Sequence, residues 1–136
     1  MTKKEMLTIF HRTIVSDFQV ACALTDLLES VRDSCLKMDG ESLSCTNDKI
    51  IASIDALRKN HLKRLKIVNA FGFSQKIDKF VASLPPKINT QLSAELEKLF
   101  NILRKCEQKN NNNGQLFAGQ HELISQLSKQ SINIKI

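Results

Sequence analysis

Apolar residues recur at alternating spacings of three and four positions from Leu7 to Met38. Nine of the ten positions in this seam are apolar; Asp17 is the exception, and Phe18 beside it can fill the gap. A seam of this length predicts a single helix of about 35 residues, or about 50 Å. We expect the helix to end at Gly40, because glycine readily takes the left-handed conformation at a helix C-terminus. The seam consists of Leu7, Phe10, Ile14, Asp17, Ala21, Leu24, Leu28, Val31, Cys35 and Met38.

A second apolar stripe follows the short connection at 40–44 and predicts a second long helix. Thr46 or Asn47 can cap its start, and Gly72 ends it. A short link between two long helices, each with an apolar stripe, predicts an antiparallel hairpin. The stripe contains Ile50, Ile54, Leu57, His61, Leu65 and Val68, and Ile51 and Leu62 widen it.

A short third helix and a long fourth one complete the predicted fold. In the segment 74–84 the apolar residues share one helical face, Ser74 can serve as N-cap, and Pro85 stops the helix. Pro86 suits the first turn of the next helix. The apolar stripe of that last helix is Leu92, Leu96, Leu99, Leu103 and Cys106, followed by Asn110, Asn113, Phe117, Gln120, Ile124 and Leu127.

Four consecutive asparagines, Asn110 to Asn113, followed by Gly114, interrupt this last stripe. Against alanine, these five residues cost a helix roughly 3 kcal/mol. Two interpretations stay open: a loop that joins two shorter helices, or a marginally stable helix that becomes ordered on a partner. The fold class is therefore all-α, an elongated antiparallel bundle of three long helices with one short extra helix. We expect one domain at 1–127 and a flexible C-terminal tail at 128–136.

The charge of the chain favours an acidic partner. Its formal net charge is +6, and a basic cluster closes the second predicted helix. A solvated face, or favourable charge at a helix C-terminus, would explain the cluster equally well. Nucleic-acid binding is not expected, because all seven Phe fall on apolar stripes or helix ends. No apolar stretch is long enough for membrane insertion, which predicts a cytoplasmic protein. The cluster comprises Arg58, Lys59, Lys63, Arg64 and Lys66.

The residue types that carry catalysis are scattered. His11, His61 and His121 lie on three different segments, and the four cysteines form no CxxC pair. We therefore predict no enzyme, no metal and no cofactor, with reduced cysteines in or beside the core. One catalytic alternative is a phosphotransfer helical bundle acting through His61. Arg64 and Leu65, however, stand where such a bundle usually has a lysine and a small residue.

Two stretches resemble the FlgN family of flagellar type III export chaperones. The first is the second predicted helix, where a lysine precedes paired apolar residues and a leucine turn. The second is the interrupted last helix, with an Asn-x-x-Asn-Gly motif followed by two apolar residues. The resemblance runs over about residues 5 to 127. It is carried by Lys49, Ile50, Ile51, Ile54 and Leu57 in the first stretch and by Asn110, Asn113, Gly114, Leu116 and Phe117 in the second.

This resemblance implies a cytosolic chaperone for the hook–filament junction proteins FlgK and FlgL. Such a chaperone binds their C-terminal helical region, prevents early assembly and aids delivery to the export gate component FlhA. Some family members dock at the gate through a C-terminal Tyr, and this sequence contains no Tyr. The implied cargo-binding residues are Asn110, Asn113, Gly114, Leu116, Phe117, Gln120, Leu123, Ile124 and Leu127.

Two questions remain open at the level of sequence. A generic helical adaptor, or a chaperone for another type III cargo, would carry the same helical pattern. The long apolar seam can also close within one chain or between two copies, so a homodimer is an alternative to a monomer.

Overall fold

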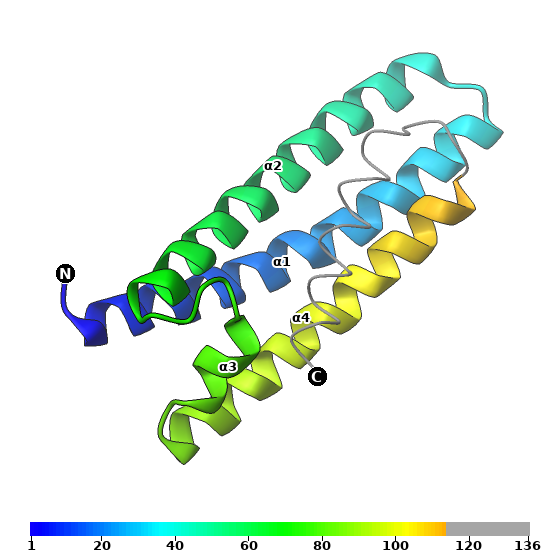
Figure 1. Cartoon of the computed structure of the whole chain (residues 1–136). Coiled ribbons are helices and arrows are strands. Elements are labelled where there is room, and N and C mark those ends of the chain that lie inside the picture. Colours follow the sequence, from blue (N-terminus) through cyan, green and yellow to red (C-terminus); the bar gives the residue numbers. More distant parts are fainter. Residues whose placement is uncertain (114–136) are drawn as a thin grey trace.

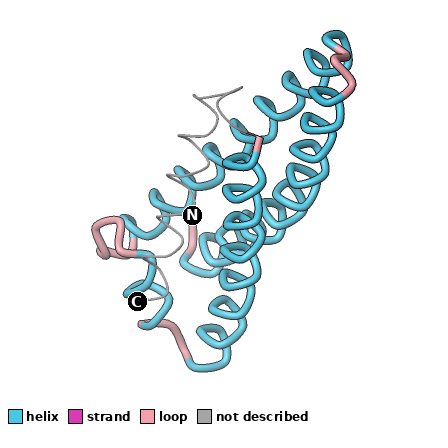
Figure 2. Tube along the Cα trace, turned by 90° about the vertical axis from the view of Figure 1, so that its right-hand side faces the viewer, coloured by secondary structure: helices cyan, strands magenta, loops and turns pink. Residues whose placement is uncertain are grey.

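The computed structural model describes residues 1–113, which form four helices and no strand. These are α1 (Lys3–Leu36), α2 (Gly40–Ala70), α3 (Ile77–Ala82) and α4 (Pro86–Asn112). Figure 1 shows α1, α2 and α4 extending along one long direction, and Figure 2 shows the short connections between the helices. The all-helical prediction is confirmed for this part of the chain.

Helix α1 packs against both α2 and α4 (Figure 1). The Asn60 amide on α2 donates to Asp17 on α1 at 2.7 Å, while the Ser34 and Ser42 hydroxyls lie 3.1 Å apart at the hairpin end. Late residues of α2 therefore face early residues of α1, as in an antiparallel hairpin. Helix α4 runs in the same direction as α1, because His11 contacts Glu95 and Ala21 contacts Cys106.

The apolar seam predicted for α1 forms the centre of the core. Every seam position from Phe10 to Val31 is buried, including the polar Asp17. The predicted stripe of α4 is buried from Leu92 to Asn110. On α2 the buried positions include two that the predicted stripe left out, whereas Ile51 and Leu62, expected to widen the stripe, are 50% and 55% exposed. The buried residues of α2 are Ile50, Ile54, Leu57, Arg64, Ile67 and Val68.

A cluster of aromatic rings fixes the short helix α3 to the rest of the molecule. The Phe80 ring, which is fully buried, lies with its centroid 5.2 Å from that of Phe10, 4.9 Å from Phe71 and 5.9 Å from Phe73. Edge-to-face and tilted pairs at these separations stabilise by about 0.5–1.5 kcal/mol each beyond the area they bury. Phe80 is the most buried of the three core residues of this six-residue helix, with Ile77 and Val81 beside it.

The first connection differs from its prediction. Helix α1 ends at Leu36, and Gly40 is the first residue of α2 instead of the end of α1. The left-handed residue is Met38, with φ 54° and a side chain 91% exposed. Asp39 caps α2 by accepting a hydrogen bond from the Ser42 backbone N–H at 3.1 Å, so Thr46 and Asn47 lie inside the helix. A carboxylate at the N-cap satisfies free N–H groups of the first turn, which moves the helix start upstream.

The second connection follows its prediction in part. Gly72, with φ 88°, ends α2 as expected, and Pro86 lies in the first turn of α4. Ser74 does not cap α3, because its own φ is 45° and the capping position falls to Lys76, which makes no side-chain cap. The turn is instead closed by Asn69, whose side-chain oxygen accepts a hydrogen bond from the Gln75 N–H at 2.6 Å.

Candidate functional site

The end of α4 carries the first two of the predicted cargo-binding residues. Asn110 lies inside the helix and is buried, and Asn113 is the C-cap. The Asn113 amide donates to the Leu28 carbonyl oxygen of α1 at 2.9 Å, and Lys109, one turn earlier on α4, pairs with Glu29, the next residue of α1. Asn113 therefore ties the end of α4 to α1, so its amide N–H already has a partner within the chain.

Asn110 differs from Asn113 in having an unused donor. Its Nδ2 is buried and has no hydrogen-bond partner among the residues that the structure describes. A buried N–H without a partner costs roughly 1–3 kcal/mol, which is more than an apolar residue of similar size would cost at the same place. The polar break in the α4 stripe is thus a real feature of the core.

The remaining predicted cargo residues lie outside the part of the chain that the structure describes, which ends at residue 113. The expected tail at 128–136 lies outside it as well, as does the region that would decide between one long helix and two shorter ones. These residues are Gly114, Leu116, Phe117, Gln120, Leu123, Ile124 and Leu127.

The five basic residues of the α2 cluster fall into three groups according to their contacts. Arg64 forms one of these groups alone. The Arg64 guanidinium is buried and pairs with the Asp17 carboxylate at 2.6 Å. Asn60 donates to the other oxygen of the same carboxylate at 2.7 Å. The expectation that Arg64 docks an acidic partner is therefore wrong: it neutralises the acidic break in the α1 seam. Phe18 does not fill that gap, since its ring is 38% exposed.

Burial raises the pKa of the Asp17 carboxyl, and its contacts with Arg64 and Asn60 oppose that rise. Both effects are expected for an ion pair taken out of water, where desolvation competes with the attraction between the partners. The pair joins residues 17 and 64 across the hairpin and sets the register of α1 against α2. Its role in the described structure is therefore a structural one.

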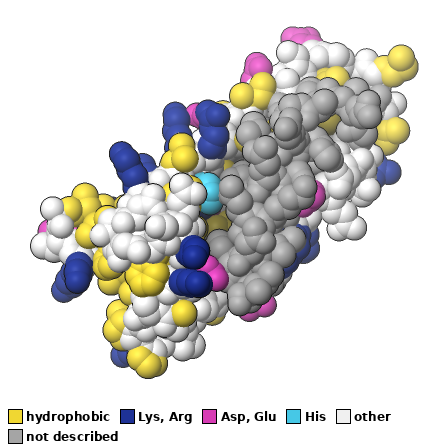
Figure 3. All heavy atoms as spheres, viewed as in Figure 1, with side chains coloured by type: hydrophobic (Ala, Val, Ile, Leu, Met, Phe, Trp, Pro, Cys, Tyr) yellow, Lys and Arg dark blue, Asp and Glu magenta, His cyan; other side chains and the backbone are white. Residues whose placement is uncertain are grey.

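The other four basic residues are exposed, and within residues 1–113 two of them form ion pairs and two do not. Arg58 and Lys59 both pair with Asp55 on the same face of α2, at 3.1 and 2.9 Å, and these pairs lower the pKa of Asp55. Lys63 and Lys66 instead line a groove against α1. Figure 3 shows Lys and Arg side chains standing along the edge of the molecule that α2 forms.

That groove has a volume of about 690 Å³ and separates the first half of α1 from the second half of α2. Its apolar lining comes from Met1, Met6, Ile9 and Ile67, and its polar lining includes Thr13, Ser16 and Asn60. Arg12 joins Lys63 and Lys66 as its basic residues. The sequence pattern indicated the two lysines but not Arg12, because only the packing of α1 against α2 brings Arg12 close to them.

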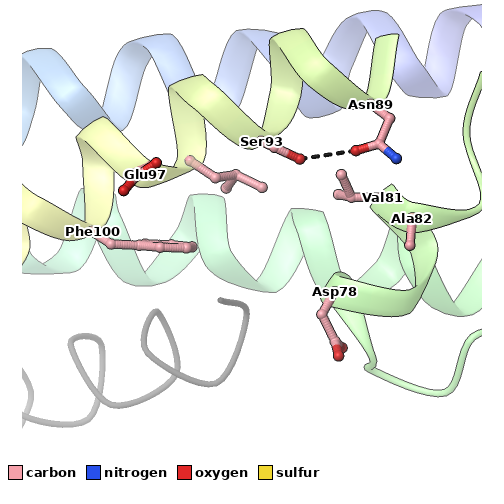
Figure 4. A pocket seen from close by; sticks show the side chains of 8 residues that line it. Asp78, Val81, Ala82, Asn89, Ser93, Glu97 and Phe100 are labelled. Carbon is pink, nitrogen blue, oxygen red and sulfur yellow. Dashed lines mark hydrogen bonds between the residues drawn. The ribbon is translucent and has the colours of Figure 1, made fainter. Parts of the chain in front are cut away.

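A smaller hollow of about 310 Å³ lies between α3 and α4 (Figure 4). Val81, Leu96 and Phe100 form its apolar floor, and the carboxylates of Asp78 and Glu97 lie at its rim. Ser93 donates to Asn89 at 3.0 Å on the α4 side, as the dashed line in Figure 4 marks. Its volume is at the lower end of what ligand pockets need, so it would hold at most a small group.

The histidines of the described region do not form a metal site. His11 pairs with Glu95 at 2.7 Å between α1 and α4, whereas His61 is half-buried on α2 next to the buried Leu57 and Arg64. His61 thus lies at the edge of the hairpin seam, where its spacing predicted it. No group of three or more metal-ligating side chains is found within residues 1–113.

The cysteines differ in accessibility. Cys106 is buried and donates to the Ala21 carbonyl oxygen at 3.5 Å, and burial raises the pKa of its thiol to about 12. Cys22 is half-buried, whereas Cys45 is exposed on α2. The expectation of a core position is therefore confirmed for Cys106.

Comparison with known proteins gives no relative: no protein-family model, no curated protein and no solved structure matches this chain. Among the helices of residues 1–113, none is long and apolar enough to cross a membrane.

Proposed function

We propose that this protein is a non-enzymatic, cytoplasmic chaperone of the FlgN type, which binds the C-terminal helical region of the junction proteins FlgK and FlgL. In this proposal the whole domain is an elongated antiparallel bundle of three long helices and one short one. It holds its cargo through the end of α4 and the residues that follow, and it delivers the cargo to the export gate component FlhA.

The observation that carries the proposal is the unused donor of Asn110. An apolar residue at this buried position would complete the α4 stripe, yet the chain has a buried amide N–H without a partner in the described region. A helix that served only as a permanent core element would not need this cost. The donor is better explained if the end of α4 rearranges to hydrogen-bond a partner.

The neighbouring contacts support the same interpretation. The end of α4 is attached to α1 by the Asn113 hydrogen bond, which is partly buried, and by the Lys109–Glu29 pair, which lies at the surface. Contacts that are open to solvent contribute little to stability, so a partner can replace them at little cost. The Asn-Gly motif that begins at Asn110 is also the more specific part of the FlgN resemblance.

The experiment that tests the proposal is a pull-down of the full chain against C-terminal segments of FlgK and FlgL. Wild type is expected to retain at least one segment, whereas Phe117→Ala and Asn110→Leu are expected to weaken retention about tenfold. Asn101→Leu is the matched control, because Asn101 lies exposed on α4 and contacts only Arg104 among the described hydrogen-bond partners.

Each outcome decides a separate point. Retention that Asn110→Leu leaves unchanged would remove the observation on which the proposal rests. If neither segment is retained, the proposal fails, and a generic helical adaptor or a chaperone for another type III cargo becomes the better description.

A further inference from the structure

The groove between α1 and α2 has the dimensions of a seat for a short helix. Its α1 side is lined at Met6, Ile9, Thr13 and Ser16, which follow one another at helical spacing along one face. Ten residues of helix extend about 15 Å. A groove of about 690 Å³ over this length can take the apolar side chains from about three turns of a second helix.

The floor of the groove is apolar and still partly open. Met6 and Ile9 are half-buried, although the core residues on the neighbouring face of α1, such as Phe10 and Ile14, are completely buried. Ile67 closes the floor from α2 and is 7% exposed. Apolar side chains that line an open groove gain stability when a partner removes them from water.

The charged side chains that line the groove, called its basic rim here, are all Lys or Arg. Arg12, Lys63 and Lys66 line it, and none of the lining residues is acidic. Within residues 1–113 these three side chains form no ion pair, in contrast to Arg58 and Lys59, which share Asp55. The other three basic residues of the α2 cluster are offset by carboxylates, Arg58 and Lys59 by Asp55 and Arg64 by Asp17. The positive potential at the groove therefore comes from Arg12, Lys63 and Lys66.

We propose that this groove binds an acidic amphipathic helix of another protein. The apolar stripe of that helix would lie on Met6, Ile9 and Ile67, with its Asp and Glu residues against the basic rim. Such a surface is separate from the cargo site proposed at the end of α4, so it provides the protein with a second partner.

Charge disfavours the two other candidate occupants. The chain's own residues 114–136 carry two Lys and only one Glu, which does not complement a basic rim. A second copy of the chain carries a formal net charge of +6, and it would bring like charges together. An acidic partner helix satisfies both the floor and the rim.

The test is a fluorescence-anisotropy titration of the full chain with synthetic helical peptides of about 18 residues, long enough to fill the groove. One peptide carries Leu at positions i, i+3, i+4 and i+7 with Glu on the flanks, and a second carries Lys in place of each Glu. The variant K63E/K66E reverses the rim. The matched control R58E/K59E makes the same charge change on the same helix outside the groove.

The acidic peptide is expected to bind with a Kd of about 100 µM or tighter, and the basic peptide not to bind. K63E/K66E should weaken binding at least about tenfold, and R58E/K59E less than about threefold. Ile9→Ser should weaken binding without changing the charge, which separates groove binding from general attraction.

Several results would overturn the proposal. Equal losses for the two double variants would mean nonspecific attraction to a basic surface. Absence of binding, or equal binding of both peptides, would exclude the acidic helix as occupant. If Phe117→Ala tightens peptide binding tenfold, the chain's own C-terminal region covers the groove. Light scattering that reports a dimer, lost in K63E/K66E, would assign the groove to a second copy. None of these results depends on FlgK or FlgL binding.

Discussion

Substitution of Arg64 should show how much the buried Arg64–Asp17 ion pair contributes to the free energy of unfolding. In Arg64→Met the apolar part of the side chain is retained, but the Asp17 carboxylate, 1% exposed, keeps only the Asn60 hydrogen bond. Leaving one member of a buried pair without its partner destabilises by about 3–5 kcal/mol. The whole free energy of unfolding of such a domain is about 5–15 kcal/mol, so the loss is a large part of it.

The pH dependence of this loss has a defined sign. Burial already raises the pKa of Asp17, and removal of Arg64 takes away the main interaction that opposes the rise. The folded state of the variant then binds a proton more readily than the unfolded state. Its stability is therefore highest below the ordinary carboxyl pKa and falls as the pH rises through the raised folded pKa. Arg64→Met should be closest to wild type near pH 4–5 and furthest from it near neutrality.

The assay is urea unfolding followed by far-ultraviolet circular dichroism, across that pH range, for a double-mutant cycle. The combined variant Asp17→Leu with Arg64→Met replaces the pair by apolar side chains and should be as stable as wild type or up to about 4 kcal/mol more stable. Arg58→Met, which breaks an exposed pair, is the control and should change the free energy of unfolding only slightly. The reasoning is refuted if Arg64→Met costs no more than this control at neutral pH, or if the combined variant is as unstable as the single one.

Three further predictions concern the helix ends and the core. Phe80→Ala should cost about 3–5 kcal/mol in urea unfolding, because α3 is held by this ring, and Phe80→Leu should cost clearly less; equal costs would deny the ring a specific role. Met38→Gly should raise the free energy of unfolding by about 1 kcal/mol, because it relieves a left-handed backbone conformation at an exposed residue. The control is Lys37→Gly at the neighbouring position, and if Met38→Gly lowers the stability as much as this control does, the prediction is wrong. Near pH 8 iodoacetamide should label exposed Cys45 and spare Cys106, whose thiol pKa is raised to about 12, until the chain is denatured; site-resolved mass spectrometry that finds both labelled in the native protein would contradict the burial.

The helices could be predicted because their signals are local. The spacing of apolar residues predicted the stripes of α1, α2 and α4, and Gly72 and Pro86 acted at the boundaries where backbone geometry requires such residues. The first turn was mislocated because two local signals compete there. Gly40 favours a helix end, but Asp39 forms an N-cap hydrogen bond, and the cap determines where α2 starts.

The candidate site was harder to predict because its parts meet only through packing. Arg64 belongs to a basic cluster in the sequence, and only the register of the hairpin brings it to Asp17. The same register places Arg12 beside Lys63 and Lys66, which makes a basic-rimmed groove from residues about fifty positions apart. A charge run or an apolar stripe in the sequence does not show which residues of two helices lie close together. The Arg64–Asp17 pair and the basic rim of the groove could therefore be found only from the structure.

Binding of a junction-protein helix by this chain is the central claim, and isothermal titration calorimetry tests it most directly. The C-terminal segment of FlgK, and in a second titration that of FlgL, is titrated into the full chain. We expect a saturable heat for at least one segment and a Kd in the micromolar range or tighter, which corresponds to a binding free energy of about −8 kcal/mol. Asn110→Leu should weaken this binding, and Asn101→Leu should not. No saturable heat with either segment, at concentrations up to about 1 mM, would contradict the proposed chaperone function.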